Sequence, residues 1–381
     1  MIANPPPNIA RTKDIKRMPN FEILRSVAML FIVVWHFCVH GITENSNIHQ
    51  FDLSLPVGIF NAITTHVICS ITGISVNLFV LITGYFLISK PHPHWLKIEK
   101  IWAHAMFYSL VFALVKLCLS PDAGQWKNIA RLFYMNEEYW FVNKYIGLMV
   151  IAPFCAQFAQ RLTKKEYLVM LFSLAVINIT FFAPFFTVIG EVNGGYSLQW
   201  FVFVFLVGGY IKNYDITESG KNTLMYFIVT VFLHLIYTFI SKWLDGELAS
   251  PVASLPYNGF LFIEAAFFFL AFKNHTFISP FWKPLIQIAP YTFGVYLIHC
   301  NHILSPLLWI GDYSPSKLIN SIWLIPCLMF ESCLIFILAI FTDWLRHVII
   351  SSIGVNRLLV LLNEKLSNIL QFLLSKTLKF T

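Results

Sequence analysis

This sequence is poor in charged residues, which make up only 12% of its 381 positions. A typical soluble domain carries about 25% charge, so this chain has too few polar groups to cover a water-soluble core. Hydrophobic residues account for 57% of the chain, and the mean hydropathy is +0.69. The composition therefore predicts a single integral membrane domain.

Several common motifs are also missing. The seven cysteines form no CxxC pair and lie in or beside apolar runs, which favours a role as small apolar side chains over a disulfide framework or zinc site. No GxxxxGK, GxGxxG or GxSxG pattern occurs, so ATP-driven, dinucleotide-dependent and serine-hydrolase chemistry have no support. No cleavable signal peptide is apparent, and the first apolar run is expected to stay in the membrane.

Ten apolar runs approach or reach the roughly 20 residues that a helix needs to cross a bilayer. The sequence thus predicts an all-α polytopic membrane bundle of about ten transmembrane helices. Residues 21–346 would form this membrane domain, after a disordered basic lead-in over 1–20 and before an amphipathic tail over 347–381. The runs lie near 23–41, 67–88, 101–119, 138–158, 166–188, 197–212, 222–243, 257–272, 286–309 and 319–345.

Lysine and arginine are distributed unevenly between the two sides of this predicted bundle. Of the 26 basic residues, 19 fall on the side of the two terminal segments, four fall on the other side and three lie inside spans. Cytoplasmic loops are enriched in Lys and Arg, so both termini are predicted to be cytoplasmic. The protein is expected to be a multi-pass protein of the inner (plasma) membrane. The net charge of +7 then reflects orientation in the membrane, and no nucleic-acid partner is expected.

Two ionisable residues inside the first apolar run carry the strongest functional signal. Arg25 and His36 are eleven residues apart, which on a helix places them on nearly the same face, roughly 16 Å apart along the axis. An ionisable residue in the membrane usually marks a functional pathway. Arg25 could instead pair with Glu22 and reach the inner headgroups, and His36 could be a structural hydrogen-bond donor. His36 and His40 also have the spacing of helical zinc sites, but no acidic third ligand matches and no metal is expected.

Other polar residues are expected at a similar depth in the outer half of the membrane. His299 lies about as far above the inner end of the ninth span as His36 does in the first, and Trp140 and Lys144 open the fourth span. The sequence therefore allows a cluster of His36, His299 and Trp140, with Lys144 or Glu264, around an outward cavity. Trp140 could instead be an interfacial anchor, and His299 could bond a neighbouring helix.

Two lysines stand at the predicted inner end of the third span. Lys97 and Lys100 are three residues apart and would share one face of a helix. They could hold the phosphates of a nucleotide-like donor that arrives from the cytosol. Alternatively, they are ordinary anchors at the positively charged inner surface.

Four segments, taken in order, carry a family resemblance. NFEILRSVAMLFIVVWHF combines an Arg, ten residues and a His, as Arg25 and His36. NLFVLITGYFLI contains Gly84 and Tyr85 preceded by Thr83. These two segments resemble the first and second helices of the acyltransferase-3 family of integral membrane acyltransferases, in which a Ser usually stands at the position of Thr83.

The later segments extend the resemblance over about 300 residues. YWFVNKYIGLMVIAPF, with Trp140 and Phe141, and TFGVYLIH, which ends on His299, are similar to two further segments of the same family. Lys97-x-x-Lys100 stands where relatives often carry Arg-x-x-Arg. That departure keeps the charge but loses the bidentate grip of arginine on phosphate.

The resemblance implies a membrane O-acetyltransferase. Acetyl-CoA would be its cytosolic donor substrate, and a hydroxyl of an extracytoplasmic cell-surface glycan or lipid-linked oligosaccharide would be the acceptor. Lipid would surround the bundle, and nothing in the sequence predicts an oligomeric state. Histidine suits the role of general base or acyl relay because the ordinary pKa of its imidazole is close to neutral pH. The implied site comprises His36 and Arg25 as catalytic residues, Trp140, His299 and Tyr85 toward the acceptor, and Lys97 and Lys100 toward the donor.

The residues alone are also compatible with two other functions. A transporter or flippase for a polysaccharide or lipid-linked sugar would also have buried polar groups in many spans. Against it, the sequence shows no inverted repeat and no matching pair of Gly/Pro-broken helices. N-acylation of an amino sugar or peptide would share the donor site and differ at the outer pocket.

Overall fold

The structure is a computed structural model that describes residues 18–42, 50–92, 95–119, 139–179, 197–217, 219–246, 257–309 and 315–353. Every regular element within these ranges is helical, as the sequence predicts. The predicted lead-in up to residue 17 and the tail beyond residue 353 lie outside the described residues. The elements are α1 (Pro19–His36), η1 (Phe37–Ile42), α2 (Pro56–Thr72), α3 (Ser75–Leu87), α4 (Trp95–Leu119), α6 (Trp140–Ala159), α7 (Lys164–Asn178), α9 (Leu198–Asn213), α10 (Gly220–Leu244), α11 (Tyr257–Lys273), η5 (Pro280–Trp282), α12 (Lys283–Ile288), η6 (Ala289–Tyr291), α13 (Thr292–His299), α14 (Ser305–Trp309), η7 (Pro315–Leu318) and α15 (Leu324–Ile353).

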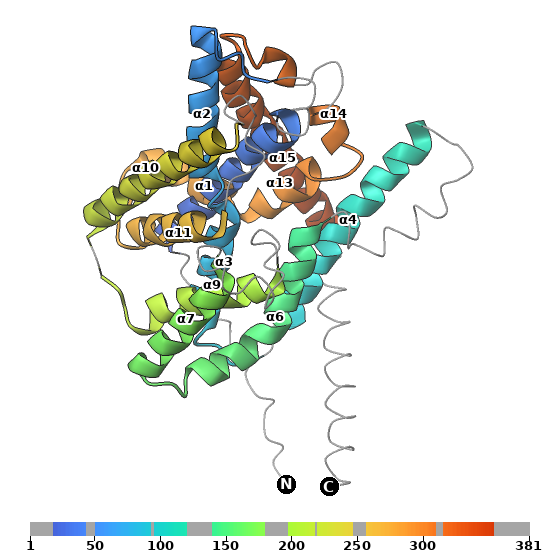
Figure 1. The fold of residues 1–381 in the computed structure, drawn as a ribbon. Helices are drawn as coiled ribbons and strands as arrows, with labels where there is room; N and C mark the ends of the chain where they lie inside the picture. The colour runs from blue at the N-terminus through green and yellow to red at the C-terminus, as the bar shows by residue number, and fades with distance from the viewer. Residues whose placement is uncertain are drawn as a thin grey trace, which may run out of the picture.

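The first helix lies at the centre of the bundle (Figure 1). It contacts α2, α3, α11, α12, α13 and α15. Within the described residues, six segments are long and apolar enough to cross a membrane, so the protein is a multi-pass membrane protein. They are Pro19–Ile42, Pro56–Leu87, Trp95–Cys118, Trp140–Ala159, Gly220–Leu244 and Leu324–Ser352.

Two predicted spans are not single helices. The run 67–88 straddles a break at Gly73 and Ile74, where α2 ends and α3 begins. The run 286–309 divides into α12, η6, α13 and α14. Pro290 lies in η6, and proline lacks the N–H that would continue a helical ladder. Helix α13 therefore begins only after η6, at Thr292, and it is eight residues long and ends at His299.

Hydrogen bonds between distant segments join loops that the charge pattern assigns to the same side of the membrane. On the predicted inner side, the Asn20 amide donates to the Lys273 carbonyl oxygen at 3.1 Å, and the Lys273 ammonium pairs with Asp215 at 3.1 Å. On the predicted outer side, the Asn61 amide donates to the Ile319 carbonyl oxygen at 2.9 Å. The total of about ten spans and the cytoplasmic position of both termini stay predictions.

Helices α3 and α9 approach each other through glycines. Gly84 of α3 faces the backbone of Phe205, and Gly208 of α9 faces the backbone of Leu81. Small residues allow such close packing between membrane helices, where van der Waals contact replaces the hydrophobic driving force. The contact fixes α3, which also contributes residues to the cavity described below.

We expect Gly84→Ala to destabilise the protein by about 1–3 kcal/mol. The added methyl group would overlap the Phe205 carbonyl oxygen and force α3 and α9 apart. The measurement is the unfolding temperature of the purified protein in detergent. Gly220→Ala is the matched control, because the nearest atom to its new methyl group is 3.5 Å away. Equal unfolding temperatures for the two variants would contradict the close α3–α9 contact.

Candidate active site

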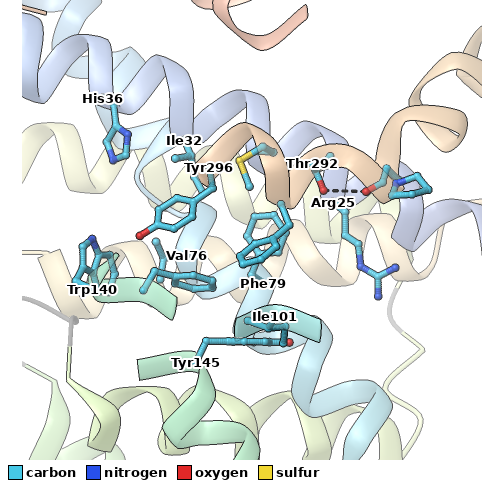
Figure 2. Close-up of a pocket in the computed structure, with 15 residues that line it drawn as sticks. Arg25, Ile32, His36, Val76, Phe79, Ile101, Trp140, Tyr145, Thr292 and Tyr296 are labelled. Carbon is cyan, nitrogen blue, oxygen red and sulfur yellow. Dashed lines mark hydrogen bonds between the residues drawn. The ribbon is translucent and has the colours of Figure 1, made fainter. Parts of the chain in front are cut away.

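A cavity of about 280 Å³ lies between α1, α3, α4, α6, η6 and α13. Arg25, Met29, Ile32 and His36 line it along one face of α1, as the eleven-residue spacing of Arg25 and His36 predicts. Figure 2 shows these two residues at opposite ends of the cavity. The other lining residues are mostly apolar or aromatic: Val76, Phe79, Ile101, Trp140, Phe141, Tyr145, Ala289, Pro290, Thr292, Phe293 and Tyr296.

His36 is hydrogen-bonded to a second buried histidine. Its Nδ1 atom lies 2.9 Å from Nε2 of His299, and Nδ1 of His299 lies 2.6 Å from the Val295 carbonyl oxygen. The structure therefore brings together two residues that are 263 positions apart in the sequence. A π-helical turn, η1, begins directly after His36, and such turns are frequent at functional sites.

When both rings are neutral, these contacts determine which nitrogen of each ring carries the hydrogen. A carbonyl oxygen can only accept a hydrogen bond, so Nδ1 of His299 must carry a hydrogen and donate it in the bond to the Val295 carbonyl oxygen. Nε2 of His299 is then an acceptor, and His36 must donate to it from Nδ1. His36 is left with a lone pair on Nε2, which is the state that a general base or nucleophile requires.

The opposite end of the cavity is positively charged. Arg25 forms a salt bridge with Glu22, and its side chain remains 31% exposed. Arg25 therefore both pairs with Glu22 and lines the cavity. Lys97 lies close enough to Lys90 and Arg25 for their positive charges to repel its ammonium group. Lys97 lies one turn before Ile101, which lines the cavity. Lys100 is exposed on the same helix and does not line the cavity.

Tyr296 is a cavity residue that the sequence argument missed. Its ring lies between the histidine end and the aromatic wall, and its hydroxyl points toward Trp140 in Figure 2. Tyr296 precedes His299 by three residues, so the two share a helix face. That spacing was the signal available in the sequence. Trp140 also lines the cavity, and its role as a substrate contact stays a prediction.

Six expected residues are not among those that line the cavity: His299, Lys97 and Lys100, described above, and Tyr85, Glu264 and Lys144. Tyr85 instead packs on Phe21, with ring centroids 4.9 Å apart, and the Lys212 ammonium lies 4.9 Å from the centre of its ring. Glu264 is fully buried, and its Oε1 lies at hydrogen-bond distance, 2.9 Å, from Nδ1 of His234. Lys144 follows Trp140 by one turn of α6 but is not a lining residue.

A buried charge cluster stands behind the cavity wall. Asp343 of α15 accepts from Nε2 of His104 at 2.7 Å, from the Tyr108 hydroxyl at 2.9 Å and from Nε of Arg346 at 2.7 Å. Gly294 of α13 packs against the Asp343 side chain and leaves no room for a methyl group. The cluster therefore holds α4, α13 and α15 together, and α13 carries half of the histidine pair.

The fold and the site define a class of protein: a helical membrane protein with an accessible histidine nitrogen at one end of an internal cavity. Comparison with family profiles matches residues 18–353 to the acyltransferase domain of the acyltransferase-3 family. This match covers most of the chain, so the chain belongs to that family and is a membrane acyltransferase. No curated protein and no solved structure matches it.

We expect His299→Phe to lower kcat by roughly 10- to 150-fold, since a hydrogen bond to a charged group contributes about 1.5–3 kcal/mol. The bond matters most once His36 has taken up a proton, so KM for the donor should be unchanged. His299→Gln should recover much of the rate because its Oε1 can accept from Nδ1 of His36. Steady-state kinetics of all three proteins make the test. An equal loss in the Phe and Gln variants would show that His299 does not act as this acceptor.

Proposed function

We propose that this protein is an O-acetyltransferase of the inner membrane. It would transfer an acetyl group from cytosolic acetyl-CoA to a hydroxyl of an extracytoplasmic cell-surface glycan. One observation carries the proposal: His36, with its Nε2 lone pair, lies at one end of a cavity that runs roughly 16 Å along α1 to the cationic Arg25.

The donor would enter at the Arg25 end. Coenzyme A carries phosphates, which Arg25 and Lys97 would attract by charge. The cavity of about 280 Å³ lies just below the usual range of roughly 300–1,000 Å³ for ligand pockets. It therefore suits the thin thioester arm of the donor better than the nucleotide, which would stay at the mouth. Apolar side chains such as Met29 and Ile32 would contact that arm.

His36 could act on the thioester in two ways. As a general base, Nε2 takes the proton of the acceptor hydroxyl while the hydroxyl oxygen attacks the carbonyl carbon. The carbon–sulfur bond then breaks, and Nε2 gives the proton to the thiolate, which leaves as the thiol. As a relay, Nε2 itself first attacks the carbonyl carbon, and the acetyl group then passes to the hydroxyl. In that case the thiolate takes up one proton at the donor end, and the hydroxyl releases one at the acceptor end.

Two neighbours would assist either route. His299 accepts from Nδ1 of His36 and would stabilise the positive charge that develops on the His36 ring. Tyr296 lines the cavity near the same end. Its hydroxyl could donate to the carbonyl oxygen as negative charge builds there, a contribution of the kind that oxyanion donors make.

The family membership favours an acyltransferase over the transporter or flippase considered from the sequence. N-acylation would use the same donor end and the same His36. Product chemistry separates these functions, because an ester-linked acetate is lost in mild alkali, an amide-linked acetate survives, and a transporter produces neither.

Expression of the protein in a host that lacks it should add alkali-labile acetate to surface polysaccharide, as read by NMR. His36→Ala should reduce this transfer by roughly 10²–10⁴-fold if His36 is the base. The amount of folded protein should not fall, because a buried membrane hydrogen bond contributes only about 0.6 kcal/mol on average. Near-normal acetylation by folded His36→Ala protein would refute the mechanism. Polysaccharide export without any acetate would favour the flippase.

Replacing both Lys97 and Lys100 by glutamine should raise KM for acetyl-CoA by severalfold and leave membrane insertion intact. Exposed ion pairs contribute about 0.2–1 kcal/mol each, and both ammonium groups are exposed. The single Lys97→Gln variant should account for most of the effect, because Lys97 shares a helix face with Ile101, which lines the cavity. Lys164→Gln with Lys165→Gln is the control, since it removes equal charge from the same predicted side. If both double variants behave alike, the lysines near α4 only orient the helix.

A further inference from the structure

Three potential metal ligands meet at the acceptor end of the cavity. Nδ1 of His36 and Nε2 of His299 are 2.9 Å apart, and the Cys300 sulfur lies 3.5 Å and 3.4 Å from them. No second group of three such side chains occurs within the described ranges of the chain. The sequence argument expected no metal site because it considered only spacings within one helix.

The triangle of donor atoms has nearly the dimensions of a zinc site. With zinc–nitrogen bonds of about 2.0–2.1 Å, zinc–sulfur bonds of about 2.3 Å and tetrahedral angles, nitrogen and sulfur lie about 3.5 Å apart and two nitrogens about 3.3 Å apart. The two nitrogen–sulfur distances already fit. The two rings need to separate by only about 0.4 Å to admit the ion.

The contact behind His299 also suits a metal ligand. Histidines that bind metals usually donate their other ring N–H to a carbonyl or carboxylate, which fixes the ring and its tautomer. His299 makes this bond to Val295 from Nδ1 at 2.6 Å, so its Nε2 lone pair points to His36 and Cys300. Cys300 follows His299 directly and caps the end of α13, so the two ligands come from one turn of the backbone.

We propose that His36, His299 and Cys300 bind a zinc-like divalent ion and that this binding inhibits the enzyme. The thiol of Cys300 would lose one proton to solvent, and the metal would bind Nδ1 of His36. The ring proton of His36 must then move to Nε2, which changes this atom from an acceptor to a donor. A His36 in that state can neither take the hydroxyl proton nor attack the thioester. Inhibition rests on the proposed function, whereas metal binding does not.

Binding is tested with Co²⁺ alone, added to purified full-length protein in detergent. Coordination by a thiolate produces a charge-transfer absorption band, which we expect for the wild type and for Cys333→Ser. Cys333 is exposed on α15 and serves as the matched control. Cys300→Ser should lack the band. A band that persists in Cys300→Ser, or that is missing from the wild type, overturns the metal site.

Inhibition is tested with Zn²⁺ in the acetyl-transfer assay. Cys300→Ser should keep its basal rate, since Cys300 takes no part in the proposed chemistry, and its half-inhibitory Zn²⁺ concentration should rise at least tenfold. A chelator should restore wild-type activity. Zinc that binds through Cys300 without slowing transfer overturns the inhibition. A wild-type protein that transfers no acetyl group refutes the proposed function, but the cobalt spectra still decide the metal site.

Discussion

The hydrogen bond between His36 and His299 is the interaction on which the site depends. It joins α1 at the centre of the bundle to α13, far away in the sequence. Without it, the His36 ring could carry its proton on either nitrogen. The Val295 carbonyl orients His299, and His299 orients His36, so a backbone group ultimately determines which nitrogen of His36 is available. Chemistry that needs one particular lone pair therefore depends on how firmly α13 is held.

The surroundings of α13 show how the bundle holds it. The Tyr139 hydroxyl donates to the Leu297 carbonyl oxygen at 2.9 Å, and the Asn301 amide donates to Tyr139 at 3.0 Å. Gly294 of the same helix packs against Asp343. A buried carboxylate is tolerable only when donors compensate its lost hydration, and three side chains donate to this one. The expense of burying Asp343 is thereby offset, and the result is a rigid support for the histidine pair.

The sequence predicted the features that depend on local periodicity and failed where distant segments meet. The shared face of Arg25 and His36 follows from helix geometry alone, and the cavity lies along that face. The breaks in two predicted spans were missed because hydropathy averages over a Gly or Pro. Lys242 was counted with the outer loops, yet it is buried at 2% exposure in the last turn of α10. Asp343 and His104 each lie inside a predicted span, but nothing in the sequence indicates that they pair, since 239 positions separate them.

The distance between the two ends of the cavity bears on the direction of transfer. Arg25 and Lys97 are fixed charges near the predicted inner surface, whereas His36, the proposed base, lies eleven residues further along α1 than Arg25. Phosphates in the hydrocarbon region would meet a large desolvation cost, so a charged donor gains by keeping them beside the cations at the mouth. Under the proposed function, only the uncharged thioester arm would need to reach inward, along a wall of methionine, isoleucine and aromatic side chains. If the proposed function holds, a single helix face that carries a cation at one end and an unprotonated imidazole nitrogen at the other would allow an acyl group to cross much of the membrane without moving a charge through it.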